Sequence, residues 1–260
     1  MPFAKWKKDT WYGIAAVASG ALCQSVLGQV ALWGNIVVYL ASKYKSSDPD
    51  LTIQFALIAF PITYATGSIA MQLGEWMMLN VTVRMQLLCG MSICIYATYM
   101  AQFCLNFDSF LWMYSVVFGI GFGICYFLPI LCAWSYFSNR PMTAGSILCW
   151  FSITAIYNSG GCTEMLNPSN ERPSVIVHNG KNIERFYDVD SDQVKKIPEM
   201  LSWLSFFGFC CMALAVPLIN KKEDETGPKK LNPNIVKLQD YLHEDFVDKT
   251  DDSTTPVRTE

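Results

Sequence analysis

Long apolar runs, separated by short polar stretches, make up most of the chain up to residue 219. The clearest run extends from Phe110 to Phe137 and contains no Asp, Glu, Lys, Arg or His. A helix needs only about 20 such residues to cross the hydrocarbon core of a bilayer, so this run predicts a transmembrane helix. Five further runs of similar character complete the pattern, and together they predict spans at residues 12–40, 51–79, 85–105, 110–137, 142–161 and 200–219.

Six spans predict an all-α fold: a polytopic membrane protein whose six-helix transmembrane bundle lies in the lipid bilayer. The composition agrees, since 52% of the residues are hydrophobic, 14% aromatic and only 16% charged, whereas roughly 25% are charged in an average soluble domain. The net charge of −3 is too small to indicate a nucleic-acid partner. We therefore expect lipid, and no nucleic acid, around this chain.

Polar residues divide the chain into parts. We expect a cytoplasmic N-terminal segment at residues 1–11, a transmembrane domain at residues 12–219 with a polar extracytoplasmic loop at residues 162–199, and a cytoplasmic, largely disordered tail at residues 220–260. A short amphipathic helix over residues 235–246 fits inside this tail. Basic residues near the span ends favour cytoplasmic termini, because cytoplasmic loops carry an excess of Lys and Arg. The sequence does not indicate which membrane holds the protein.

The loop between the fifth and sixth spans contains a turn signal. Asn179-Gly180 stands between two short runs of residues with high β-propensity. Asn-Gly is the preferred pair in a two-residue turn that reverses a strand, so this stretch predicts a β-hairpin.

Acidic residues after the hairpin imitate the ligand spacing of a calcium-binding helix-loop-helix. They are Asp188, Asp190, Asp192 and Glu199. Gln193, however, occupies the position where such a loop requires glycine for its sharp turn. We interpret the stretch as a solvated acidic turn that leads into the sixth span.

Most of the ten cysteines fall inside the predicted spans, and only Cys162 lies near a loop. Cysteine within such helices behaves as a small apolar residue, so packing is the favoured interpretation over metal or redox chemistry. The one alternative is a Cys104–Cys162 pair, because both residues lie near the same predicted face of the membrane. We expect no bound metal and no cofactor.

Uncharged polar residues interrupt the first span and recur in the fourth and fifth. Such residues are costly in a membrane unless they find a partner or a wet cavity. One interpretation is hydrogen bonding between helices, worth about 0.6 kcal/mol for each bond; the other, of equal weight for the first span, is that they line a substrate path. The candidates for that path are Gln24, Gln29, Asn35, Tyr126, Tyr157 and Asn158.

The fourth span combines close packing with a kink. Gly119, Gly121 and Gly123 remove side chains from one half of it, and Pro129 removes a backbone donor from the other half. Arg84 precedes the third span and Arg140 follows the fourth, and we place both in cytoplasmic loops.

An enzyme is not indicated. The only histidines, His178 and His243, lie outside the predicted spans. No pair of carboxylates and no metal-ligand spacing falls where a wet pocket would form within the spans.

The pattern resembles the amino-terminal six-span half of a major facilitator superfamily transporter, in the oxalate/formate antiporter-like or monocarboxylate-transporter-like branch. The likeness covers residues 11–220. Four stretches carry it: Gly28 through Trp33-Gly-Asn35, Gly119-x-Gly-x-Gly-x-x-Tyr126-x-x-Pro129, Tyr136-Phe-Ser-Asn-Arg140, and Asn167-Pro-Ser-Asn with Lys196-Ile-Pro-Glu-Met200.

The chain departs from this superfamily in three respects. The loop from Gly74 to Arg84 lacks the acidic residue and the second glycine of the usual latch motif, and Pro141 follows Arg140 where a basic residue is expected. Members of the superfamily have twelve spans in two halves that rock about a central site, whereas this sequence holds six. The span interiors hold no Lys or Arg to meet an anion.

Two functions follow. The resemblance implies transport of a small solute, a monocarboxylate or similar organic anion, by alternating access, with the six spans working as a half-transporter or fragment beside a second copy or a missing carboxy-terminal half. The alternative is a non-transporting, truncated six-span membrane protein that acts by binding partners.

Overall fold

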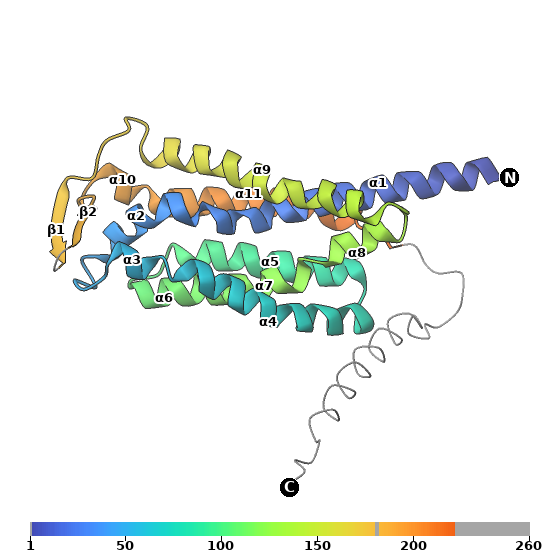
Figure 1. Ribbon diagram of the computed structural model, residues 1–260, viewed down its shortest axis with the longest axis horizontal. Helices are drawn as coiled ribbons and strands as arrows, with labels where there is room; N and C mark the ends of the chain where they lie inside the picture. Colours follow the sequence, from blue (N-terminus) through green and yellow to red (C-terminus); the bar gives the residue numbers. More distant parts are fainter. Residues whose placement is uncertain (1, 180–181, 222–260) are drawn as a thin grey trace, which may run out of the picture. The chain divides into compact units, whose positions relative to one another are not determined.

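A computed structural model describes residues 2–179 and 182–221. The predicted tail, including the helix expected at residues 235–246, lies almost wholly outside these residues. The chain is mostly helical with one small sheet (Figure 1). In chain order the elements are α1 (Pro2–Leu27), η1 (Gly28–Leu32), α2 (Trp33–Tyr44), α3 (Ile53–Ala56), α4 (Ala59–Asn80), α5 (Val83–Ala101), α6 (Phe107–Leu111), η2 (Trp112–Val117), α7 (Phe118–Cys125), α8 (Leu128–Trp134), α9 (Arg140–Leu166), β1 (Val175–Asn179), β2 (Asn182–Phe186), α10 (Asp192–Lys195) and α11 (Ile197–Leu218).

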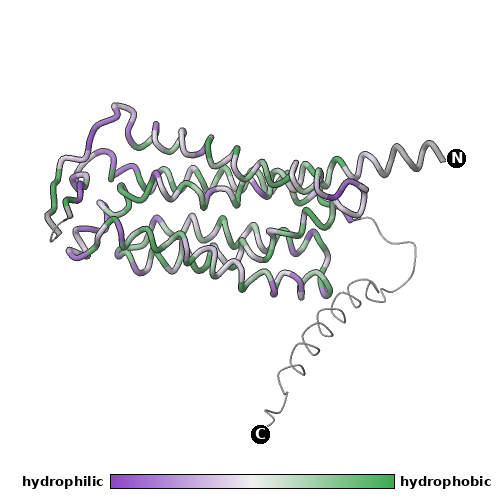
Figure 2. Tube along the Cα trace, viewed as in Figure 1, coloured by the Kyte–Doolittle hydropathy of each residue, from purple (hydrophilic) through white to green (hydrophobic). Residues whose placement is uncertain are grey.

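Four helical runs are long and apolar enough to cross a membrane: Thr10–Tyr44, Ile53–Asn80, Phe107–Trp134 and Asp192–Leu218. They match the first, second, fourth and sixth predicted spans, so the protein is a helical membrane protein. α5 and α9 cover the other two predicted spans without reaching that level of apolarity. The reason lies in their polar residues, since α5 carries Arg84 and Gln86 in its first turn, and α9 carries Ser, Thr and Asn along its length. Figure 2 shows the hydrophobic colouring along the long helices and hydrophilic colouring in the connections.

The long helices lie side by side in an open series. α4 packs on α7, α7 on α5, α5 on α11, α11 on α1, and α1 on α9. The described residues show no comparable contact between α4 and α9, which form the two edges of this series. We call the end that carries β1 and β2 the hairpin end, and the opposite end, where α8 packs on α1 and α9, the α8 end (Figure 1).

α7 sits tightly between α4 and α5 because its glycines let backbones approach. A Cβ atom on Gly119 would lie 2.8 Å from the carbonyl oxygen of Thr63, and one on Gly121 would lie 2.6 Å from that of Gly90. A Cβ atom on Gly123 would collide with the carbonyl oxygen of Gly67. Small residues at such contacts replace the hydrophobic driving force that is absent inside a bilayer.

Two of the membrane-length helices are irregular. The first passes through the 3₁₀ segment η1, and the one that contains α7 passes through the π-helical segment η2 directly after α6. The latter helix is interrupted again at Tyr126 and Phe127, and Pro129 lies in the first turn of α8. A π-helical turn inside an α-helix is uncommon and frequently marks a functional site.

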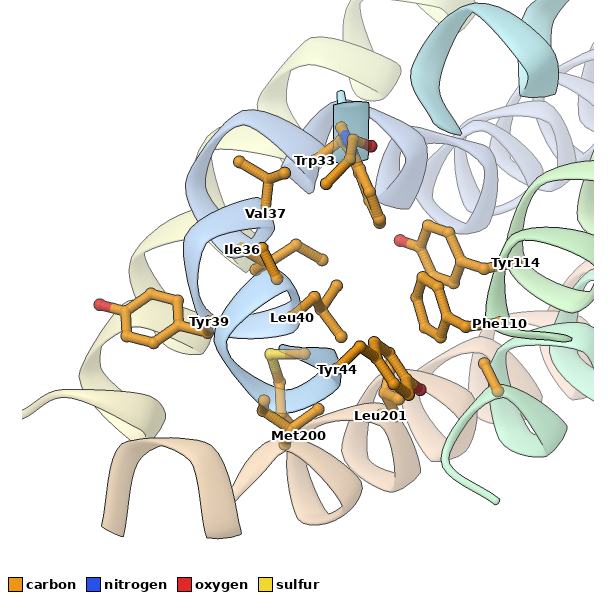
Figure 3. Close-up of a cluster of buried hydrophobic side chains, with 14 of the residues drawn as sticks. Trp33, Ile36, Val37, Tyr39, Leu40, Tyr44, Phe110, Tyr114, Met200 and Leu201 are labelled. Carbon is orange, nitrogen blue, oxygen red and sulfur yellow. The ribbon is translucent and has the colours of Figure 1, made fainter. Parts of the chain in front are cut away.

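An aromatic cluster fills the hairpin end (Figure 3). The indole of Trp33 stacks on the ring of Phe110 with centroids 5.8 Å apart, and the rings of Phe110 and Tyr114 stack at 5.2 Å. Tyr44 adds a tilted contact with Phe110 at 5.5 Å. Rings of this size dominate the energetics of a buried cluster. They close the hairpin end of the bundle.

The structure confirms the predicted β-hairpin. β1 and β2 pair antiparallel, and Asn179 lies opposite Asn182. Asn179, predicted as a turn residue, is therefore the last residue of β1. The acidic turn after the hairpin includes an ion pair between Asp190 and Lys195 at 3.5 Å.

Cys104 and Cys162 are both free thiols, so the alternative of a disulfide between them is wrong. Cys162 is instead fully buried within the apolar cluster at the hairpin end. Across residues 2–179 and 182–221, no group of three or more His, Cys, Asp or Glu side chains is arranged to hold a metal ion.

Candidate solute path

A seam of polar side chains runs along α1 and η1 on the inside of the bundle. Ser19, Gln24, Ser25 and Gln29 are all buried. Ser19 Oγ donates to the carbonyl oxygen of Ala215 at 2.8 Å. The seam supplies hydrogen bonds between helices.

Gln29 faces α11. Its Nε2 donates to the carbonyl oxygen of Leu204 at 3.1 Å. Its own backbone carbonyl accepts a hydrogen bond from the hydroxyl of Tyr114 at 3.4 Å. Gln29 therefore joins η1 to α11 through its side chain and to η2 through its backbone.

Gln24 faces the interruption in the fourth predicted span. Its Nε2 donates to the backbone carbonyl of Tyr126 at 3.3 Å. Its Oε1 is buried and has no hydrogen-bond partner among the described residues. The ring of Tyr126 is half-buried beside those of Phe122 and Phe127. An acceptor without a partner beside a helix break can take a donor from a solute or from water.

Buried polar side chains of α9, beginning with Thr154, face this seam. Thr154 Oγ1 donates to Ser25 Oγ at 3.0 Å, and the Ser25 hydroxyl donates in turn to the carbonyl of Ala21. One turn further along α9, Asn158 is completely buried. Neither its amide nitrogen nor its amide oxygen has a hydrogen-bond partner in the part of the chain that the structure describes. A buried amide with both groups unpaired is costly, so Asn158 is the most conspicuous of the polar residues predicted for the path.

Two further predicted residues lie on exposed surface. Asn35, in α2, is exposed, and its amide donates to the hydroxyl of Ser159 on α9. Tyr157 is 67% exposed on α9. The structure thus brings Gln24, Gln29 and Asn158 into the interior and leaves Asn35 and Tyr157 at its edge.

A cavity of about 400 Å³ lies at the α8 end between α4 and α9, where these two helices do not pack on each other. Its walls are mostly apolar, with Met71 and Met78 from α4, Leu131 from α8 and Leu148 from α9. Its one charged wall residue is Glu75. None of the six predicted path residues lines this cavity.

Gln86 also borders the cavity and was not among the predicted site residues. Its Nε2 donates to two carbonyl oxygens, those of Gly74 at 2.8 Å and Ile124 at 2.9 Å. This single amide holds α5, α4 and α7 together. The signal in the sequence was a lone amide close to the start of an apolar run.

Basic side chains lie at the ends of the bundle. Arg84 Nε donates to the carbonyl of Ile219 at 3.4 Å, which ties the start of α5 to the end of α11. The guanidinium of Arg140 lies 5.9 Å from the centroid of the Trp134 ring. The predicted span interiors hold no Lys or Arg, so the hydrogen-bond donors inside the spans are all neutral.

Comparison with known protein families finds no family that matches this sequence. The chain is similar to apicoplast pyruvate carrier 1 of Toxoplasma gondii, with 24% identity over 239 aligned residues. The alignment covers 76% of this chain and 44% of the carrier, so the chain spans less than half the length of that relative.

Proposed function

We propose that this chain moves a small monocarboxylate, pyruvate or a close analogue, across a membrane by alternating access. The observation that carries the proposal is the similarity to a pyruvate carrier along 76% of the chain. The buried polar seam supports it, because Gln24 and Asn158 keep unpaired polar atoms inside an apolar bundle. The same similarity gives no support to an enzyme.

We propose further that the six long helices are one half of a transporter of the major facilitator type. The open series of helices favours this arrangement, since α4 and α9 form two edges with no comparable packing between them. A second unit of the same kind, either a second copy or a carboxy-terminal half, would cover these edges. The relative is more than twice as long as the part that aligns, which is consistent with two such units.

The charge of the solute also favours a second unit. A carboxylate inside a membrane needs a cation or several convergent donors. The described seam supplies amides and hydroxyls only, and the cavity at the α8 end carries the carboxylate of Glu75, which repels an anion. In this proposal the second unit supplies the cation, while the seam supplies neutral donors.

The alternative is a six-span membrane protein that binds partners and transports nothing. Its support is the use of Ser19 and Gln29 in hydrogen bonds between helices, which accounts for part of the seam without any solute. The departures around Gly74 and Arg140 from the latch motif favour it as well.

Uptake by the purified 260-residue chain in proteoliposomes tests the two functions. Vesicles loaded with unlabelled pyruvate should accumulate labelled pyruvate by exchange, and the rate should saturate and fall when other monocarboxylates compete. Vesicles without protein are the control. Uptake equal to that of empty vesicles, from protein shown by circular dichroism to be helical, would favour the alternative.

A further inference from the structure

The segment between α9 and α10 is folded against the hairpin end at several points. We propose that the β1–β2 hairpin and Tyr187 form a releasable clamp that holds the hairpin end closed. The inference rests on the proposed function, because the clamp would regulate access of the solute to the same path. The residues that fasten the clamp are Glu184 and Phe186 of β2 and Tyr187, and Asn167 at the end of α9 is one of their partners.

Tyr187 fastens the clamp to α2. Its backbone N–H donates to Ser42 Oγ at 2.9 Å, and its ring stacks on that of Tyr39 with centroids 4.8 Å apart and planes inclined by 12°. Its hydroxyl donates to the carbonyl of Glu171 at 3.0 Å. The amide of Asn167 donates to the same hydroxyl at 3.2 Å. Tyr187 therefore joins the end of α9 to α2, in addition to the direct hydrogen bond that the amide of Asn167 donates to the hydroxyl of Tyr39 at 3.4 Å.

Glu184 fastens the clamp to α3, which is the first part of the second membrane-length run, Ile53–Asn80. Its Oε2 accepts a hydrogen bond from the backbone N–H of Ile53 at 3.3 Å. This N–H belongs to the first turn of α3, where no partner exists within the helix. Phe186 is 1% exposed, and the ammonium of Lys45 lies 5.1 Å from its ring centroid.

These contacts connect the two edges of the open series. The clamp follows α9 along the chain and reaches α3, which leads directly into α4. At the α8 end the same two helices, together with α7 and α8 between them, line the cavity of about 400 Å³. The bundle is thus closed at the hairpin end and hollow at the α8 end. The hairpin end can open only when the contacts of the clamp with α2 or with α3 break.

The opposite faces of the hairpin differ in a way that suits a clamp. Phe186 and Val177 lie on the face that packs against the bundle. Ile176 and Arg185, which pair across the strands, are both exposed on the other face. Because only one face is anchored, the hairpin can leave the bundle as a unit without losing its own strand pairing.

A reversible cross-link tests the clamp. In the variant S42C/Y187C, a copper–phenanthroline oxidant would join thiols at two positions that are already in contact, since Ser42 Oγ lies 2.9 Å from the backbone nitrogen of Tyr187. The matched control is I176C/R185C, whose residues face each other within the hairpin, so its disulfide leaves the clamp free. Oxidation should lower pyruvate exchange by S42C/Y187C at least tenfold, a reductant should restore it, and the control should keep its rate. Equal exchange before and after complete oxidation of S42C/Y187C would overturn the inference.

A second readout separates the clamp from the transport proposal. Cys162 is fully buried in the same apolar cluster as Phe186 and Tyr187, so its reaction with a maleimide, measured by site-resolved mass spectrometry, reports release of the clamp. Tyr187→Ala should raise that rate at least fivefold, while Tyr187→Phe, which keeps the stack on Tyr39, should stay within about twofold of the wild type. If neither the wild type nor any variant exchanges pyruvate, the transport proposal fails, and the labelling rate of Cys162 alone then tests the clamp. Labelling slowed by the cross-link and accelerated in Tyr187→Ala supports a releasable clamp, and labelling unchanged in both overturns it.

Discussion

The hydroxyl of Tyr114 donates a hydrogen bond to the backbone carbonyl of Gln29 at 3.4 Å and so joins the two irregular segments of the bundle. Gln29 lies in the 3₁₀ segment η1, and Tyr114 lies in the π-helical segment η2. Both segments depart from the regular i to i−4 hydrogen-bond pattern, which leaves backbone carbonyls able to accept other donors. The two irregularities therefore stabilise each other through a buried hydrogen bond beside the aromatic cluster.

Tyr114→Phe should weaken this junction without disturbing the aromatic cluster. The stack on Phe110 remains, and only the hydroxyl is lost, so we expect a loss of about 1 kcal/mol in the free energy of unfolding, the usual value for one hydrogen bond. Thermal unfolding in detergent measures it. Tyr157→Phe, at a site that is 67% exposed, is the control and should leave the melting temperature unchanged.

Gly121→Ala should destabilise the bundle. The added Cβ would lie 2.6 Å from the carbonyl oxygen of Gly90, and overpacking of this kind costs about 1–3 kcal/mol. Gly160→Ala is the matched control, since it is also helical and has nothing within 4 Å of the added atom. There alanine should stabilise the helix by up to about 1 kcal/mol. The folded fraction that survives heating in detergent should therefore fall in Gly121→Ala and rise in Gly160→Ala. A loss of stability in both variants would show that close packing at Gly121 is not the cause.

The helical pattern of the fold followed from the sequence, while the depth and partners of its polar residues did not. A helix satisfies every backbone group inside lipid within one segment, and an uncharged run of this length is long enough to span as a helix, so Phe110 to Phe137 was predictable as helix. The irregular segments η1 and η2 were not predicted, because the residues within them are ordinary helix-compatible residues. Their geometry depends on tertiary contacts such as the one between Tyr114 and Gln29.

Residue type alone also could not predict which buried amides hydrogen-bond another helix and which have no partner. Gln29 and Gln86 donate to backbone carbonyls, whereas Asn158 is buried with both amide groups unpaired. Nothing in a single sequence distinguishes these three, because the difference lies in which neighbouring carbonyl each amide can reach. The favoured interpretation of the cysteines as packing residues holds for Cys162, which is buried in the apolar cluster and is a free thiol.

Asn158→Leu should separate function from stability. Removing a buried amide with no partner relieves a cost of about 1–3 kcal/mol, so we expect the variant to melt at a higher temperature than the wild type. If Asn158 contacts the solute, pyruvate exchange should fall at least tenfold in the same variant. Thr154→Val is the control, because its hydroxyl already has Ser25 as a partner. A more stable Asn158→Leu with undiminished exchange would remove this residue from the path.

High pH should release the clamp through Tyr187. Burial, together with the hydrogen bond to Tyr39, raises the pKa of Tyr187 from 10.0 to about 12. A group that is harder to ionise when docked loses its contribution as pH rises above the pKa of the released form, so the clamp weakens between about pH 10 and pH 12 and is unaffected below pH 9. Maleimide reaction rises steeply with pH for any thiol, so the labelling rate of Cys162 should be divided by that of exposed Cys149. This ratio should increase above pH 10 in the wild type and stay flat in Tyr187→Phe, which has no phenol to ionise. Equal ratios in both proteins across this range would show that ionisation of Tyr187 does not control the clamp.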